Sequence, residues 1–205
     1  MMADDSQTFD DLLMAIALPD EPTTTRLHAR LVDLAERDDL LDVSYRTVDS
    51  PFGELLLAAT PHGLVRVAFA IEGHDNVLAR LSTAISPRIL QAPRRLDNAA
   101  RQLDDYFTGR LRAFDLPLDL QLAHGFRHTV LLRLLDIAYG STASYASIAA
   151  AAGSPAAVRA VGSACATNPL PLIVPCHRVV RSDGSIGHYL AGSDAKRALL
   201  ALEAR

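Results

Sequence analysis

Residues 168–180 read Asn-Pro-Leu-Pro-Leu-Ile-Val-Pro-Cys-His-Arg-Val-Val, and this run is the most informative part of the chain. Its three prolines restrict the backbone, and the apolar residues between them predict burial. Cys176, His177 and Arg178 therefore follow one another at the end of a stiff, buried arm. A nucleophilic cysteine reacts as the thiolate, which neighbouring basic groups favour. The pattern predicts a reactive thiol at Cys176, although a cysteine in apolar surroundings is also commonly a small core residue.

His177 is expected to act on Cys176 through a water molecule, because adjacent side chains diverge and do not meet head-on. A carboxylate would then orient the imidazole, and Glu203 is a candidate. The last helix is predicted to begin at Ser193 and to bury Ala195, Ala198, Leu199 and Leu202. Glu203 lies beside that face, in a last turn where the helix dipole disfavours a carboxylate. A second role would explain its presence, and a solvated terminal glutamate is the alternative.

The residues before this arm predict a helix-turn-helix. A helix with a strongly apolar face is expected over Phe126–Ile137, and Ser144 can cap another from Tyr145 to Ala152, ended by Gly153. Ser154 and Pro155 are then expected to start a further helix at once. On that helix Val158, Val161 and Cys165 share one side, and Arg159 lies roughly 100° away. Its other residues are small, so it either approaches another surface closely or packs tightly in the core.

An α/β unit is predicted before these helices. Short apolar runs divided by Pro/Gly turns indicate strands at Val43–Val48, Leu55–Ala59 and Leu64–Phe69. Helical spacing follows over His74–Ile85 and Leu96–Phe107, and residues 115–120 are expected to be extended. The apolar stripe of the second helix is predicted to consist of Leu96, Ala100, Leu103 and Phe107. Residues 1–41 show two helical stretches, Phe9–Ala17 and Leu27–Ala35, and are interpreted as an extension that packs on the main body.

Composition and charge narrow the class of protein. The 205 residues carry a net charge of −4, but Ser141–Arg205 holds six basic and three acidic residues, so this segment permits DNA binding. The chain has two cysteines, which excludes a disulfide scaffold and a cysteine-rich zinc site. Its apolar runs fall short of the roughly 20 residues that cross a membrane. The N-terminus lacks the basic start of a secretory signal, so a cytoplasmic protein is expected.

Pro-Cys-His-Arg-Val at 175–179, preceded by Asn168-Pro169, resembles the signature of the O6-alkylguanine-DNA alkyltransferase family. This family is also called methylated-DNA–protein-cysteine methyltransferase. Further matches cover about residues 43–205. They comprise Tyr139-Gly140, Ser144-Tyr145, Arg159-Ala160-Val161-Gly162, Gly187-His188-Tyr189, Lys196, Leu199-Leu200 and Glu203.

The resemblance implies a ribonuclease-H-like α/β domain over 42–120 and a mainly helical domain with a (winged) helix-turn-helix over 121–205. It also implies binding to the minor groove of double-stranded DNA that carries an alkylated guanine, and extrusion of the damaged nucleotide. The alkyl group would pass irreversibly to the protein, once per molecule and without cofactor or metal. A monomer is expected. Cooperative binding along DNA and action on O4-alkylthymine stay open.

The site residues are carried over position by position. Cys176 matches the nucleophile, and His177 and Glu203 match its activating relay. Asn168 matches the asparagine that braces the active-site turn, and Tyr145 the tyrosine that rotates the nucleotide and donates a proton towards guanine. The remaining matches concern DNA and the pocket: Arg159 as the finger that fills the gap left by the flipped base, Ala160 and Gly162 beside it on the recognition helix, Pro171 and Tyr189 as pocket walls, and Ser182 in the pocket loop.

Three departures from the family pattern stand out. Leu131 replaces a tryptophan that is usual in the family. The pocket loop reads Tyr189-Leu190-Ala191-Gly192 in place of Tyr-x-Gly-Gly, which predicts an altered tolerance of large O6 adducts. The zinc-binding residues that some members have in the N-terminal domain are missing.

Three other classes of protein fit the sequence less well than a transferase. A damage sensor that binds without transfer would usually lack the nucleophile, which is present here. A methylation-responsive transcriptional regulator would need a further cysteine near the N-terminus. A cysteine hydrolase would need a base in direct reach of the thiol and an oxyanion hole, which adjacent Cys176 and His177 do not supply.

Overall fold

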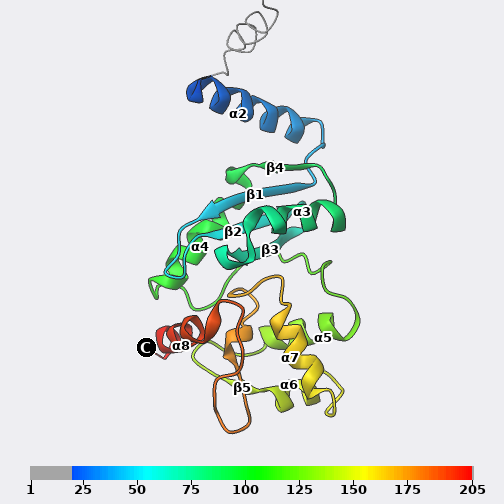
Figure 1. Ribbon diagram of the computed structural model, residues 1–205, viewed down its shortest axis with the longest axis vertical. Coiled ribbons are helices and arrows are strands. Elements are labelled where there is room, and N and C mark those ends of the chain that lie inside the picture. The colour runs from blue at the N-terminus through cyan, green and yellow to red at the C-terminus, as the bar shows by residue number, and fades with distance from the viewer. Residues whose placement is uncertain (1–19, 205) are drawn as a thin grey trace, which may run out of the picture. The chain divides into compact units, whose positions relative to one another are not determined.

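The computed structural model describes residues 20–204, which divide into two units at Leu40/Leu41 (Figure 1). The first unit contributes one described helix, α2 (Glu21–Arg37). Asp20 caps it by accepting a hydrogen bond from the amide of Thr23 at 3.1 Å. The helix therefore starts earlier than predicted and includes Leu27–Ala35. The predicted stretch Phe9–Ala17 lies outside the described residues, and packing of this extension on the main body stays a prediction.

The second unit holds the rest of the chain. Its α/β part comprises β1 (Val43–Val48), β2 (Leu55–Thr60), β3 (Gly63–Phe69), the 3₁₀ turn η1 (Ala70–Glu72), α3 (His74–Ala84), β4 (Ile89–Gln91), the 3₁₀ turn η2 (Pro93–Leu96) and α4 (Asp97–Phe107). Its helical part comprises α5 (Gly125–Leu135), β5 (Ala143–Ser144), α6 (Tyr145–Ala151), α7 (Val158–Ala166), the 3₁₀ turn η3 (Cys176–Arg178), β6 (Val179–Val180) and α8 (Gly192–Glu203). The predicted combination of an α/β part with a mainly helical part is confirmed.

The sheet is mixed, with strand order β3-β2-β1-β4. β1, β2 and β3 pair antiparallel as the predicted meander, while β4 pairs parallel to β1. β4 was not predicted, because three residues are too few to show the period-two alternation of a strand. Arg66 of β3 pairs with Ala58 and therefore lies on the same face of the sheet, and the register shifts only beyond this pair, between Ala58 and Ala59.

Alternate residues of β2 point to opposite faces of the sheet and pack in two different hydrophobic cores. Leu56 and Ala58 pack with Val77 and Leu81 of α3 on one face of the sheet. Leu55 and Leu57 pack on the other face in a larger core. That core is shared with α4 and with the helical part through Leu96, Leu103, Tyr106, Val130, Leu131, Leu134, Val161 and Leu199. The α/β part therefore reaches the functional arm through a common core.

The buried face of α4 differs from the predicted stripe. Ala99, Leu103 and Tyr106 are buried, whereas Ala100 and Phe107 are only partly so. Apolar residues spaced either three or four apart can share one face of a helix. The apolar pattern alone therefore could not decide between two buried faces of α4 that differ by one residue position. The difference matters because it turns Tyr106 inward.

The helix-turn-helix is present, but its second helix starts later than predicted. Gly153 adopts φ +77°, and the amides of Gly153 and Ser154 bond back to the carbonyls of Ala150 and Ala149. This is a Schellman closure of α6. Ser154 is thus part of the end of α6, and a turn separates it from the start of α7 at Val158. The prediction that Ser154 caps the second helix is wrong.

The buried face of the last helix, α8, also differs from the predicted one. Ala195 and Leu199 are buried as predicted, but Ala198 is exposed, and Lys196 and Glu203 are buried instead. Leu131, which stands where the resemblance implies a tryptophan, is fully buried in the core. None of the helices within residues 20–204 is long and apolar enough to cross a membrane.

Candidate active site

The arm before Cys176 is buried along its whole length, as its composition predicts. Leu172 takes a positive φ of +76°, which is uncommon for a side-chain-bearing residue and marks a backbone held by its surroundings. Asn168 fixes both ends of the arm. Its Oδ1 accepts from the amide of Leu170 at 3.0 Å, and its Nδ2 donates to the carbonyl of Val174 at 2.8 Å.

The same amide nitrogen of Asn168 lies 3.2 Å from Sγ of Cys176. Burial raises the pKa of the Cys176 thiol, while the hydrogen bond from Asn168 and the positive charge of Lys196 act to lower it. Desolvation is the larger effect, so the net shift of the pKa is opposite to the one that the basic residues next to Cys176 predicted. The raised pKa favours the thiol form of Cys176, and a thiol needs a base before it can react as a nucleophile.

His177 and Glu203 meet in the core beside this thiol. His177 Nε2 lies 2.9 Å from Glu203 Oε1, and both side chains are almost fully buried. Burial lowers the pKa of His177, which keeps the imidazole neutral. Its Nδ1 has no hydrogen-bond partner among residues 20–204, so this nitrogen is free to accept a proton. A neutral imidazole bonded to a carboxylate on one side can act as a general base on the other.

Glu203 is held by more donors than His177 alone. Arg178 donates from Nε to Oε2 at 2.8 Å and from Nη2 to Oε1 at 2.9 Å. The amide of Gly140 and the hydroxyl of Tyr106 also donate to it. Burial acts to raise the pKa of Glu203, but the hydrogen bonds from His177 and Arg178 outweigh it and lower the pKa to about 2.

Lys196 belongs to the same buried cluster, although its sequence context predicts no role for it. Its side chain is fully buried, and Nζ donates to the carbonyl of Val179. Burial lowers the pKa of Lys196, while the two cysteines act in the opposite direction. One feature of the sequence could have drawn attention to this residue, because Lys196 is the only lysine in a chain whose other basic residues are arginines and histidines.

The two tyrosines predicted for the site differ in exposure. Tyr189 packs edge-on against His177, with ring centroids 6.3 Å apart, and its hydroxyl has no partner in the described part of the chain. Tyr145, at the start of α6, is half-buried. A Cβ on Gly187 would stand 2.4 Å from the Tyr145 hydroxyl, so only glycine allows this close approach. Pro171 is buried in the arm, and Ser182 is exposed in the loop after β6.

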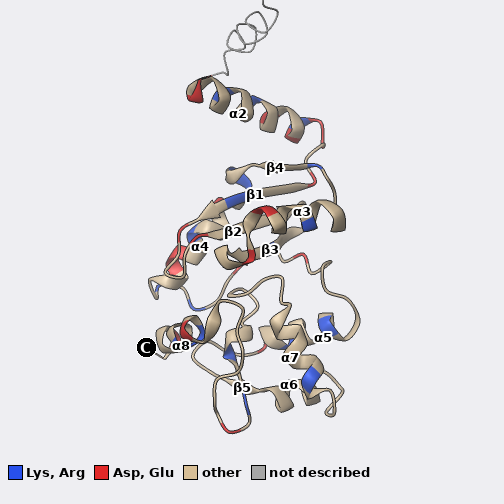
Figure 2. Ribbon diagram, in the orientation of Figure 1, with Lys and Arg blue, Asp and Glu red and all other residues tan. Residues whose placement is uncertain are grey.

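α7 presents a surface that another molecule can approach closely. Arg159 and Ala160 are exposed, and no described atom lies within 4 Å of the place where a Cβ on Gly162 would stand. Figure 2 shows α7 with a single charged segment, and that segment is basic. Small side chains with one projecting arginine suit contact with a polyanion.

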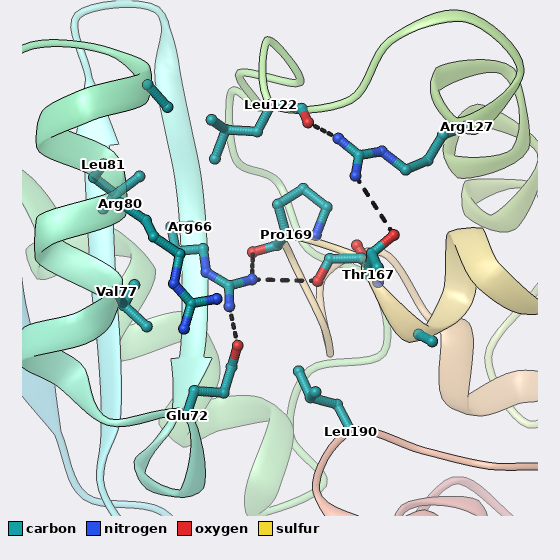
Figure 3. A pocket seen from close by; sticks show the side chains of 13 residues that line it. Arg66, Glu72, Val77, Arg80, Leu81, Leu122, Arg127, Thr167, Pro169 and Leu190 are labelled. Carbon is teal, nitrogen blue, oxygen red and sulfur yellow. Dashed lines mark hydrogen bonds and ion pairs between the residues drawn. The ribbon is translucent and has the colours of Figure 1, made fainter.

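A cavity of about 340 Å³ lies next to the arm (Figure 3). Arg66, Glu72, Arg127, Pro169 and Leu190 are among its lining residues, and Cys176 is not. Arg66 spans it, donating to the carbonyls of Asn168 and Pro169 at 3.3 and 3.2 Å and pairing with Glu72. No group of three or more His, Cys, Asp or Glu side chains within residues 20–204 is placed to hold a metal ion.

Comparison with known proteins gives consistent matches. Residues 43–120 match the family model described as 6-O-methylguanine DNA methyltransferase, ribonuclease-like domain, and residues 125–205 match the DNA binding domain of the same description. The chain is 39% identical over 163 residues to the methylated-DNA–protein-cysteine methyltransferase of Mycolicibacterium paratuberculosis, covering 80% of this chain and 93% of that protein. It is also 39% identical over 159 residues to the protein of that name from Methanosarcina barkeri, covering 78% and 96%.

Solved structures agree in fold. The Mycobacterium tuberculosis O6-methylguanine methyltransferase superposes with a TM-score of 0.69 at 40% identity, over 79% of this chain and 93% of that one. Mycobacterium tuberculosis OGT in complex with DNA superposes with a TM-score of 0.68 at 39% identity, over 78% and 92%.

Proposed function

Since the chain belongs to the methylated-DNA–protein-cysteine methyltransferase family, we propose that it repairs DNA by moving an alkyl group from O6 of guanine onto its own Cys176. The observation that carries the proposal is the buried Cys176 thiol, bonded to Asn168 and adjacent to a neutral His177 whose Nδ1 is free. This arrangement supplies a nucleophile and a base, while Nε2 of His177 is bonded to the anionic Glu203.

The reaction is a displacement at carbon. A water molecule passes the thiol proton of Cys176 to Nδ1 of His177, and the sulfur attacks the alkyl carbon. The new S–C bond forms as the O6–C bond breaks, and the electron pair stays on guanine. Tyr145 donates a proton towards the guanine as it leaves. The thioether product is stable, so each molecule transfers one alkyl group and needs no cofactor.

The DNA has to present the lesion outside the stack, because the thiol lies in the protein core and cannot enter a duplex. We assign Arg159, with Ala160 and Gly162 on the exposed face of α7, to the minor groove and to the gap left by the flipped nucleotide. Pro171, Tyr189 and Ser182 are assigned to the pocket that receives the base. The division of the second unit into domains 42–120 and 121–205, and the monomeric state, belong to the same proposal.

Intact-mass measurement tests the transfer. The protein is incubated with a duplex that contains one O6-methylguanine, and with the same duplex containing guanine. We expect a gain of one methylene unit with the lesion only, mapped by peptide sequencing to Cys176. Cys165→Ala is the matched control, because it removes the other buried cysteine, and it should still gain the methyl group, whereas Cys176→Ala should not.

The alternative function, a damage sensor without transfer, predicts a different result. Such a protein would bind the lesion duplex more tightly than the undamaged one, and its mass would not change over hours. That outcome would overturn the proposal and direct attention to Leu190 and Ala191 in the pocket loop.

A further inference from the structure

Tyr106 brings a hydroxyl from the α/β part into the relay of the helical part. It lies near the end of α4, is completely buried, and donates its proton to Oε1 of Glu203 at 2.7 Å. The phenol oxygen of Tyr106 itself lies 3.4 Å from Nε2 of His177. The two groups that act on Cys176 are therefore both in reach of one phenol that comes from 71 residues upstream of His177.

We propose that Tyr106 is a positioning residue for alkyl transfer, which keeps the proton of neutral His177 on Nε2 and thereby leaves Nδ1 open towards the thiol. The inference rests on the proposed function, because it gives a reason for the tautomer that the transfer requires. It extends the machinery beyond the arm and α8 to a helix of the other part of the protein.

The hydrogen-bond geometry around Glu203 supports this assignment. Oε1 accepts from Tyr106, from Arg178 Nη2 at 2.9 Å and from His177 Nε2 at 2.9 Å. With the phenol proton directed at Oε1, the phenol oxygen turns lone pairs towards Nε2. A proton on Nε2 then points at two oxygen acceptors, Glu203 Oε1 and the phenol oxygen, and is stabilised by both. A lone pair on Nε2 would instead be repelled by the lone pairs of these two oxygens. The alternative, in which the phenol donates to Nε2, would exchange a 2.7 Å bond for a 3.4 Å contact.

The ring of Tyr106 has a separate, purely structural role. It packs against Phe107, Phe114 and Tyr139, with centroids 5.5, 5.2 and 6.4 Å away. These contacts involve the ring alone. Tyr106→Phe therefore keeps the packing and removes only the hydroxyl, which separates positioning from core stability.

The kinetic test compares single-turnover transfer from a duplex with O6-methylguanine, over a series of protein concentrations. Tyr106→Phe should lower the maximal rate roughly tenfold, the effect of one hydrogen bond to a charged group, and leave the half-saturating concentration unchanged. Tyr139→Phe is the matched control, since its hydroxyl contacts the carbonyl of Leu202 at 3.4 Å and not the relay. It should transfer at the wild-type rate.

Nitrogen NMR of histidine-labelled protein gives a readout independent of activity. The signal of His177, assigned by its loss in His177→Asn, should report a proton on Nε2 in the wild type and a mixture of tautomers in Tyr106→Phe. A wild-type proton on Nδ1, or Tyr106→Phe with unchanged tautomer and rate, overturns the inference. If the wild type transfers nothing, the proposed function fails, while the tautomers still decide the role of Tyr106.

Discussion

Nδ2 of Asn168 lies 3.2 Å from Sγ of Cys176 and 2.8 Å from the carbonyl oxygen of Val174, so one amide group joins the nucleophile to the arm that carries it. Its Oδ1 closes the other end of the arm through the amide of Leu170. Because Asn168 is itself buried, none of these groups can turn to water when the side chain is removed.

Asn168→Ala should therefore cost roughly 2–4 kcal/mol in the free energy of unfolding, since it leaves buried backbone groups without partners. Asn168→Asp keeps the acceptor for Leu170 and loses the donor, so it should slow alkyl transfer more than its effect on stability explains. Urea unfolding and single-turnover transfer measure the two effects. The exposed Asn76→Ala serves as control, and equal behaviour of Asn168→Asp and wild type in transfer would contradict the prediction.

Glu203 should make the protein sensitive to acid. Its pKa in the folded protein is about 2, against an ordinary value of 4.5. The ionised carboxylate thus contributes stability that is fully present above pH 4.5 and is lost as the pH falls through about 2. Urea midpoints measured across this range should fall steeply for the wild type.

Glu203→Gln should remove much of this acid dependence and also lower stability at neutral pH. Arg178 then keeps its buried charge without a counter-ion, a change that costs about 3–5 kcal/mol. Asp75→Asn on the exposed side of α3 is the control and should alter neither property. A variant Glu203→Gln as stable as the wild type at pH 7 would show that the Arg178 pair does not stabilise the fold.

Lys196 should favour the thiolate of Cys176. Lys196→Met keeps a long buried side chain and removes the charge that lowers the pKa of Cys176. The pH profile of alkyl transfer should move up by about one unit, as expected when an opposite charge is lost from the neighbourhood. Lys196→Arg should not restore the wild-type profile, because the fully buried site has to hold a planar guanidinium in place of a compact ammonium. An unchanged profile in Lys196→Met would rule out the electrostatic role.

The sequence predicted the elements whose signal is local. Pro/Gly turns and apolar runs predicted the strands at 43–48, 55–59 and 64–69, each within one residue of the observed bounds, and the burial of residues 168–180 follows from their composition. Glu203 could be placed next to a buried helix face for the same reason. In each case the spacing of residues along the chain carries the information.

The parts that could not be predicted depend on contacts between distant segments. Tyr106 reads as one of two adjacent aromatic residues on α4, and only the packing of the two parts turns it towards Glu203. Lys196 is a charged residue, and charged residues are seldom fully buried, so nothing in the sequence around it predicts its burial. The start of α7 was misplaced because the amide of Ser154 is used to close α6. None of these outcomes has a periodic signature.

The pocket loop should affect the size of the alkyl group that is accepted. Leu190 lines the cavity beside the arm, and Ala191 carries a methyl group immediately before α8. We expect Ala191→Gly to raise the rate of transfer from O6-benzylguanine relative to O6-methylguanine in matched duplexes. Leu190→Ala is tested alongside to separate the two positions. A ratio of benzyl to methyl transfer that is the same in the wild type and both variants would exclude the loop as a determinant of adduct size.

Arg66 should couple the sheet to the active-site arm. Its guanidinium donates to the carbonyls of Asn168 and Pro169 and pairs with Glu72 in surroundings where both side chains are largely buried (Figure 3). Arg66→Met removes the donor and leaves Glu72 without its cation, so we expect a loss of roughly 1–3 kcal/mol in unfolding free energy. Arg66→Met/Glu72→Gln removes the stranded charge and should recover part of that stability. Alkyl transfer should be slower than in the wild type in both variants, because the carbonyls of Asn168 and Pro169 lose the donor Arg66 in each. If the double variant regained the wild-type rate, Arg66 would act through the Glu72 pair and not through the arm.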